Sequence, residues 1–171
     1  MGGEAEVVTL RPEDEPEDTA VLETVPRPLR VLPLAGLDRV GVVLVSHSRA
    51  VAEAVAAMAA DLLGTGDPAP VATAGSVPED GLGTGPALVA AAAREVDQGM
   101  GVAVIVDLDG SVGTVRGVLA AAEAHGLPFP VRLADAPFVE GAVAAVATAS
   151  AGGDLSAVIE AAEDCYVVRK L

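Results

Sequence analysis

From Val40 onward, short runs of aliphatic residues alternate with longer segments that have helical periodicity. This order of elements is typical of an α/β domain, in which helices cover a mostly parallel sheet. The run over residues 40–45 contains only aliphatic residues and glycine, as expected for a central strand that is buried on both faces. We therefore predict an α/β fold with an open, doubly wound, mostly parallel sheet of about four strands and helices on both faces.

Glycine, proline and capping residues divide this region into elements. The predicted strands are short and aliphatic, and they cover residues 40–45, 70–74, 102–106 and 131–133. The predicted helices cover residues from about 48 to 63, 86–96, 112–124, 138–149 and 155–162. In the first helix, one apolar stripe is formed by Val51, Val55, Met58 and Leu62. Asp154 is predicted to cap the last helix.

The beginning of the chain has a different composition. Residues 11–18 combine repeated acidic charges with prolines, and such a segment cannot bury enough apolar surface to offset the entropy lost on ordering. We predict a disordered acidic tail over residues 1–38, a folded domain over residues 39–165, and a C-terminal extension over residues 166–171.

Charge and composition exclude several classes of function. A formal net charge of -15 argues against a nucleic-acid partner and suits a basic protein partner. Because Cys165 is the only cysteine, neither an internal disulfide nor a cysteine-rich metal site is possible. No apolar run reaches the roughly 18 residues of a membrane span, and no secretory signal is visible. We expect a cytoplasmic protein without membrane insertion and without a metal site.

Three predicted loops meet at one edge of this sheet. They follow the first three strands and cover residues 46–48, 75–85 and 107–111. In an open parallel sheet, the functional site lies at the carboxyl ends of the strands, near the point where strand order reverses. The loops would bring an imidazole, hydroxyls, carboxylates and backbone amides together there.

His47 is the leading candidate for chemistry, because it lies between a buried strand and the start of a helix. A neutral imidazole nitrogen is a competent nucleophile near pH 7, and it can carry a phosphoryl group. Ser46, Ser48 and the first helical amides could bind phosphate oxygens. Either Asp107 or Asp109 could hold the other ring nitrogen. The alternative is an ordinary helix-capping loop, with both aspartates as turn residues.

Two further features carry weaker signals. The glycine-rich stretch 81–85 fits neither the dinucleotide fingerprint nor the lysine-containing phosphate loop, and it has no lysine. It leaves no visible nucleotide site, and it can equally be a turn in which Thr84 or Gly85 caps the next helix. His125 precedes Gly126 at a predicted helix end, where a structural role is expected.

Four stretches resemble a known family, the phosphocarrier subunits (DhaM) of phosphoenolpyruvate-dependent dihydroxyacetone kinase. They are residues 42–48, 83–84, 107–111 and, most specifically, Asp-Ala-Pro-Phe-Val-Glu-Gly over residues 135–141. The resemblance runs in the same order from about Val40 to Asp164. It implies a domain similar to the IIA domain of mannose-type sugar phosphotransferases.

The resemblance also implies a function as a phosphotransferase subunit, a phosphoenolpyruvate–glycerone phosphotransferase. His47 would accept a phosphoryl group from the phosphocarrier protein HPr and pass it to ADP on the nucleotide-binding kinase subunit. Dihydroxyacetone is then phosphorylated on a third subunit. This chain would need no cofactor, since ADP or ATP with Mg would be held by the partner subunit. The resemblance further suggests a homodimer.

The expected site consists of His47, an orienting Asp107 or Asp109, and the phosphate-binding residues Ser46, Ser48, Thr84 and Ser111. The family commonly reads Asp-Leu-Gly-Ser after the third strand, whereas this chain inserts Asp109, so the orienting carboxylate stays open. Two alternative functions also stay open. One is a IIA component of a mannose-family sugar-uptake system, and the other is a regulatory binding module controlled by phosphorylation.

Overall fold

The computed structural model describes residues 38–64, 66–76 and 85–168. In this part of the chain, four parallel strands form one sheet in the order β2-β1-β3-β4. The strands are β1 (Gly41–Ser46), β2 (Val71–Gly75), β3 (Val102–Val106) and β4 (Val131–Leu133). The predicted open, parallel α/β sheet is confirmed.

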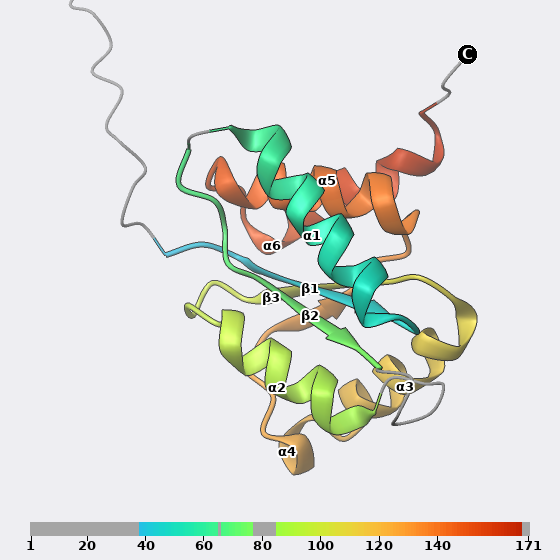
Figure 1. Ribbon diagram of the computed structural model, residues 1–171. Coiled ribbons are helices and arrows are strands. Elements are labelled where there is room, and N and C mark those ends of the chain that lie inside the picture. The colour runs from blue at the N-terminus through green and yellow to red at the C-terminus, as the bar shows by residue number, and fades with distance from the viewer. Residues whose placement is uncertain (1–37, 65, 77–84, 169–171) are drawn as a thin grey trace, which may run out of the picture. The chain divides into compact units, whose positions relative to one another are not determined.

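Helices cover both faces of this sheet (Figure 1). One face is covered by α1 (Arg49–Leu63), α5 (Phe138–Ser150) and α6 (Leu155–Glu163). The other face carries α2 (Pro86–Val96) and α3 (Asp109–Ala120), followed by the short α4 (Ala122–His125). A 3-10 turn over Asp164–Tyr166 follows α6.

The central strand β1 builds both halves of the core. Val42 and Leu44 pack on the side of α1, α5 and α6, whereas Val43 and Val45 pack on the side of α2 and α3. All four side chains are fully buried. Burying a Val or Leu side chain contributes about 1.5–3 kcal/mol, so both faces of β1 stabilise the domain. This explains why the strand contains no polar side chain before Ser46.

The apolar stripe predicted on α1 is largely wrong. Val51, Met58 and Leu62 are 46%, 38% and 67% exposed. The residues that α1 buries are small, and they are Ala52, Val55 and Ala59. Small side chains let the helix lie close to the branched side chains of β1 and β2, so the larger apolar residues fall on the outer side.

Helix α3 begins earlier than predicted. It starts at Asp109 and not at Val112, because the amides of Ser111 and Val112 both donate to the carbonyl of Leu108 (3.0 and 3.3 Å). The chain then breaks at Ala121 and resumes as the separate helix α4. Residues 109–111, predicted as loop, therefore form the first helical turn.

Other predictions from the sequence are confirmed. The bounds of α2, β3 and β4 are those predicted. Asp154 caps α6, since its carboxylate accepts a hydrogen bond from the amide of Ala157 (2.9 Å). Residues 1–37 lie outside the described part of the chain, so the acidic tail stays a prediction.

Gly75, the last residue of β2, lies against the start of α1. A Cβ at this position would be 2.5 Å from the Cα and 2.7 Å from the backbone nitrogen of Arg49. Because these atoms belong to the backbone, they cannot move aside cheaply. We expect Gly75→Ala to lower the free energy of unfolding by about 1–3 kcal/mol, the usual cost of overpacking, as measured by urea denaturation.

Gly66→Ala is the matched control, because the nearest atom to a Cβ there is 3.9 Å away. Equal stability of the two variants would contradict the close approach of β2 and α1.

Candidate functional site

The candidate residues lie where strand order reverses. Strand β1 is flanked by β2 on one side and β3 on the other, and the chain passes from β2 back across β1 to reach β3. His47 directly follows β1 and Asp107 directly follows β3. The amide of Asp107 donates to the carbonyl of Val45 (3.1 Å), which continues the pairing into the site. This is the place where ligands bind in open parallel sheets.

The carboxylate of Asp107 is the centre of a hydrogen-bond network. Its Oδ2 accepts hydrogen bonds from Ser46 Oγ (2.8 Å) and from the amide of His47 (2.9 Å). Its Oδ1 accepts hydrogen bonds from the amide of Leu108 (2.7 Å) and from Ser111 Oγ (3.0 Å). These four donors come from the ends of both central strands and from α3, so they fix the carboxylate in one orientation.

This network also determines the charge of Asp107. Burial alone would raise the pKa of Asp107, but hydrogen bonds from the His47 amide, Ser46, the His47 ring and Ser111 outweigh burial and place the pKa below its usual value. The side chain is therefore an ionised acceptor at neutral pH. Its contribution to stability is present above the unfolded carboxyl pKa of about 3.9, and it is lost as pH falls through the lower folded value.

The imidazole of His47 is held through one nitrogen. Nδ1 lies 3.1 Å from Asp107 Oδ1 and 3.1 Å from Ser111 Oγ. Because the ionised carboxylate can only accept, Nδ1 carries the proton that it shares with these oxygens. In the neutral ring, Nε2 then has the free lone pair of a nucleophile. The side chain is 30% exposed, so a second molecule can reach it.

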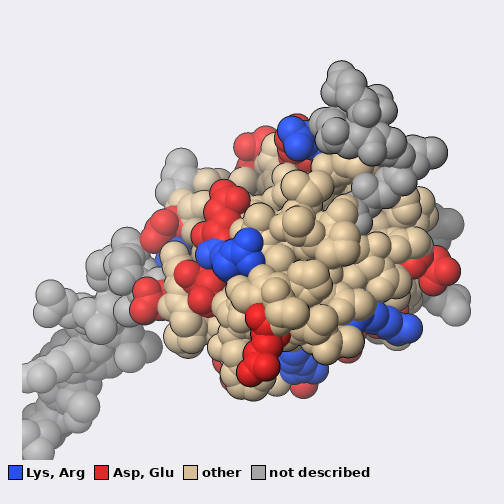
Figure 2. Space-filling model, turned by 90° about the horizontal axis from the view of Figure 1, so that it is seen from below, with Lys and Arg blue, Asp and Glu red and all other residues tan. Residues whose placement is uncertain are grey.

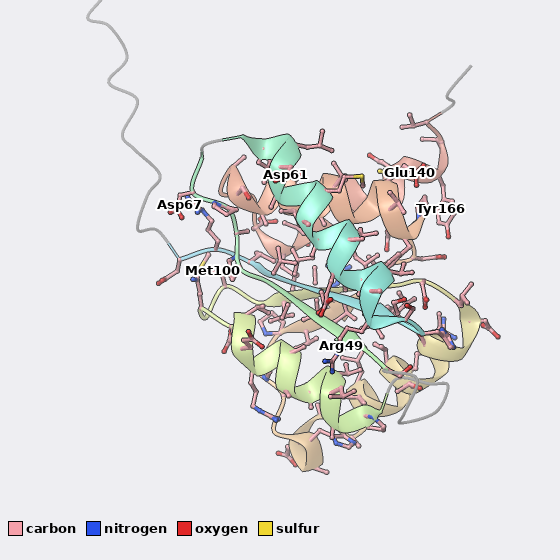
Figure 3. All side chains as sticks on the ribbon, in the orientation of Figure 1. Arg49, Asp61, Asp67, Met100, Glu140 and Tyr166 are labelled. Carbon is pink, nitrogen blue, oxygen red and sulfur yellow. The ribbon has the colours of Figure 1, made fainter. Side chains whose placement is uncertain are left out.

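The backbone around His47 is fixed from both sides. Ser46 Oγ accepts from the amide of Ser48 (3.0 Å), and Ser76 Oγ donates to the carbonyl of His47 (2.8 Å). Arg49 is the first residue of α1 (Figure 3). Its amide donates to the carbonyl of Ser76 (3.1 Å). Ser76 is not among the site residues predicted from the sequence. Its only signal is its position directly after β2, at the same edge of the sheet as His47.

The remaining candidates are placed differently. Within the described residues, Asp109 makes no hydrogen bond to His47, and its side chain is exposed in the first turn of α3. The side chain of Ser48 is half-buried beside the histidine, and its hydroxyl does not cap α1. Thr84 lies outside the described residues. The predicted site residues that the structure brings together are thus His47, Asp107, Ser46 and Ser111.

A cavity of about 410 Å³ adjoins the site, between the carboxyl ends of β3 and β4. Asp107, Asp109, Arg116 and Asp135 are among the residues that line it. Tyr166 (Figure 3) lines one side of this cavity. Its hydroxyl donates to Asp135 (3.3 Å). The surroundings of Asp107 are therefore polar and open to solvent on this side.

The described residues contain no group of three His, Cys, Asp or Glu side chains that could hold a metal ion. None of the described helices combines the length and the apolar character needed to cross a bilayer. The face of the domain that Figure 2 shows is mostly uncharged at its centre, and acidic and basic groups lie beside one another toward its edges.

Comparisons with known proteins agree with this geometry. The family model of the PTS system fructose IIA component (EIIA-man) matches residues 41–159. A curated relative from Pantoea ananatis (strain LMG 20103), the phosphoryl donor subunit DhaM of PEP-dependent dihydroxyacetone kinase, is 34% identical over 138 residues. The match covers 77% of this chain and 28% of that relative, so the chain spans little more than a quarter of the relative's length.

Structural similarity supports the fold separately. The crystal structure of EF1359, a protein of unknown function, superimposes with a TM-score of 0.60 at 23% sequence identity. The superposition covers 74% of this chain and 94% of that one. The matched family region runs from β1, through the histidine loop and α3, into α6. The chain therefore belongs to the EIIA-man family, the mannose-type IIA components of the phosphotransferase system.

Proposed function

We propose that this chain is a phosphohistidine carrier that accepts a phosphoryl group on Nε2 of His47. One observation carries the proposal. The ionised Asp107 and the hydroxyl of Ser111 hold Nδ1, which leaves Nε2 as the free nitrogen of an accessible ring. Membership of the EIIA-man family supports the same assignment. The proposed donor is the phosphohistidine of the phosphocarrier protein HPr.

In the first step, the lone pair of Nε2 attacks the phosphorus of the donor phosphohistidine. A new N–P bond forms on His47, the N–P bond of the donor breaks, and the donor imidazole recovers its lone pair. The proton on Nδ1 stays in place, so the phosphorylated ring gains positive character. The carboxylate of Asp107 stabilises that charge at 3.1 Å, and it acts as a positioning residue for the ring.

The first turn of α3 favours the transferred group electrostatically. The amides of Ser111 and Val112 donate to the carbonyl of Leu108, whereas the amides of Asp109 and Gly110 precede them in the turn and lack intrahelical partners. The positive end of the helix dipole supports a phosphoryl group at this place. Ser48 and Thr84 remain proposed additional phosphate ligands.

In the second step, a phosphate oxygen of ADP attacks the phosphorus, the N–P bond of His47 breaks, and the ring returns to its neutral form. We propose that ADP is held with Mg by the nucleotide-binding subunit of a dihydroxyacetone kinase, since the curated relative is such a kinase's phosphoryl donor subunit. This chain then needs no nucleotide site of its own. The proposed partners are HPr, the two kinase subunits and a second copy of the chain.

The stretch 135–141 favours dihydroxyacetone kinase over sugar uptake. It connects β4 to the first turn of α5, and Asp135 and Ala136 line the cavity beside Asp107. Gly141 keeps this turn compact, because a Cβ there would be 2.8 Å from the Cβ of Ala136. The residues that most resemble the dihydroxyacetone branch therefore lie next to the proposed site, where a partner subunit would dock.

The proposal is tested with purified components. The chain is phosphorylated with phosphoenolpyruvate, the general phosphotransferase enzyme and HPr, and is then freed from these donors. It is next mixed with the ADP-loaded kinase subunits and dihydroxyacetone. We expect close to one dihydroxyacetone phosphate per phosphorylated chain.

Two results would contradict the proposal at different levels. Failure of phospho-HPr to phosphorylate the chain would contradict the carrier function itself. A phosphorylated chain that passes nothing to the ADP-loaded subunit would contradict the acceptor, and it would favour a sugar-uptake component or a regulatory module.

A further inference from the structure

Gly110, in the first turn of α3, lies directly beside the free nitrogen of His47. A Cβ built at this glycine would be 2.8 Å from Nε2 and 3.2 Å from Cε1. Apart from its chain neighbours and the helix backbone, it would meet no other atom of the described residues within 4 Å. A Cβ above the face of the ring would approach all five ring atoms. This Cβ approaches only Nε2 and Cε1, so it would lie beyond the edge of the ring at Nε2 and not above its face.

A new bond to Nε2 must point into this space, because the lone pair of the nitrogen lies in the plane of the ring and points outward. We infer that the phosphoryl group on His47 occupies the space that the missing side chain of Gly110 leaves open. Gly110 is thus a specificity-determining position for phosphorylation at Nε2. The inference rests on the proposed carrier function and adds the place that the group takes.

The backbone gives no other reason for a glycine at this position. Gly110 lies inside α3, and it is not among the glycines with positive φ. In a helix, alanine is more stable than glycine by about 0.5–1 kcal/mol. Helix stability alone would therefore favour alanine over glycine. The close approach of this position to Nε2 is the reason why a side chain does not fit.

The ring cannot easily avoid an added methyl group. A contact of 2.8 Å is too short for a Cβ, so either the ring or the helix must shift. Moving the ring would stretch the contacts of Nδ1 to Asp107 Oδ1 and Ser111 Oγ, both 3.1 Å. An alanine would therefore either cover Nε2 or pull the ring away from the carboxylate, and both changes reduce phosphorylation.

The same helix contains two matched controls. Gly113 and Gly117 also lie within α3. Beyond the helix itself, a Cβ at either position would meet no atom of the described part of the chain within 4 Å. Gly113→Ala and Gly117→Ala make the same chemical change in the same helix as Gly110→Ala, but away from the imidazole.

The test compares these three variants with the native chain. Each is treated with phospho-HPr and, separately, with phosphoramidate, a small donor that needs no docking surface. Intact mass follows the rate, and thermal unfolding follows stability. We expect Gly110→Ala to lower the rate with both donors on the order of 100-fold, the effect of displacing reacting groups by about 1 Å. The controls should stay within about twofold of the native rate, and neither control should have a lower Tm.

The outcomes separate this inference from the proposed function. If the native chain is phosphorylated and Gly110→Ala reacts as fast with phosphoramidate, the inference is wrong while the carrier function stands. If neither donor phosphorylates the native chain, the carrier function fails. If the Tm of Gly110→Ala falls, ¹⁵N NMR of the folded variant shows whether the His47 ring itself is displaced or covered. Unperturbed ring nitrogens together with native reactivity overturn the inference, and a displaced ring or a covered Nε2 with lost reactivity supports it.

Discussion

Replacing His47 with glutamine is expected to abolish phosphorylation of the chain by phospho-HPr. Glutamine has no nucleophilic nitrogen, and His125, the other histidine of the sequence, precedes Gly126 at the end of α4, away from the Asp107 network. The fold should persist, because the ring is 30% exposed and Asp107 keeps its bonds to Ser46, Leu108 and Ser111. Intact mass before and after acid treatment measures the acid-labile phosphate.

His125→Gln is the control for this experiment and should be phosphorylated like the native chain. Retention of acid-labile phosphate on His47→Gln, or its loss from His125→Gln, would contradict the assignment of the nucleophile.

Asp107→Asn is expected to lower the rate of phosphorylation about 10- to 100-fold, the usual effect of removing the partner that orients a functional histidine. An amide has one acceptor oxygen where the carboxylate has two, and the carboxylate accepts from donors on both oxygens. An amide nitrogen that faces Nδ1 would donate to it and move the ring proton to Nε2. The variant also lacks the negative charge that stabilises the phosphorylated ring.

Asp109→Asn is the matched control, because it removes the same charge two residues further along the chain. In the described structure, the side chain of Asp109 makes no hydrogen bond to His47. Single-turnover phosphorylation by phospho-HPr should place this control within about twofold of the native rate. A large loss in Asp109→Asn with a native rate in Asp107→Asn would show that the wrong carboxylate has been assigned.

The pH dependence of stability gives a second measure of the Asp107 network. Because the folded pKa of Asp107 is lowered, its contribution is present above a pH of about 4 and is lost as pH falls through the folded value. The difference in unfolding free energy between the native chain and Asp107→Asn should therefore narrow as pH is lowered. Urea denaturation at several pH values measures it, and a difference that widens toward acid pH would contradict the lowered pKa.

Much of the fold could be predicted because glycine, proline and charged residues occur at the ends of its helices and strands. Pro86 begins α2 and Asp154 caps α6 as the sequence indicates. The buried face of α1 could not be predicted in this way. Periodicity fixes the angle between residues on a helix, but the space beneath the helix decides that Ala52, and not Met58, faces the sheet.

The site was predictable to the level of the histidine and its strand. The choice between Asp107 and Asp109 needed the register, in which Val45 pairs with Val106 and so brings residue 107 beside the histidine loop. The start of α3 was missed because Asp-Gly is common both in turns and near helix starts. Ser76 and Gly110 contact His47 from elements that are distant in sequence, so no local sequence pattern predicts these contacts.

The central claim is that His47 carries its proton on Nδ1 and its phosphoryl group on Nε2. Long-range ¹H–¹⁵N NMR of the ring, recorded near neutral pH before and after phosphorylation by phospho-HPr, tests this most directly. For the neutral ring of the free chain, the structure predicts the tautomer with the proton on Nδ1, and phosphorus coupled to Nε2 after phosphorylation. A free ring protonated on Nε2, or a phosphoryl group bonded to Nδ1, would contradict the account.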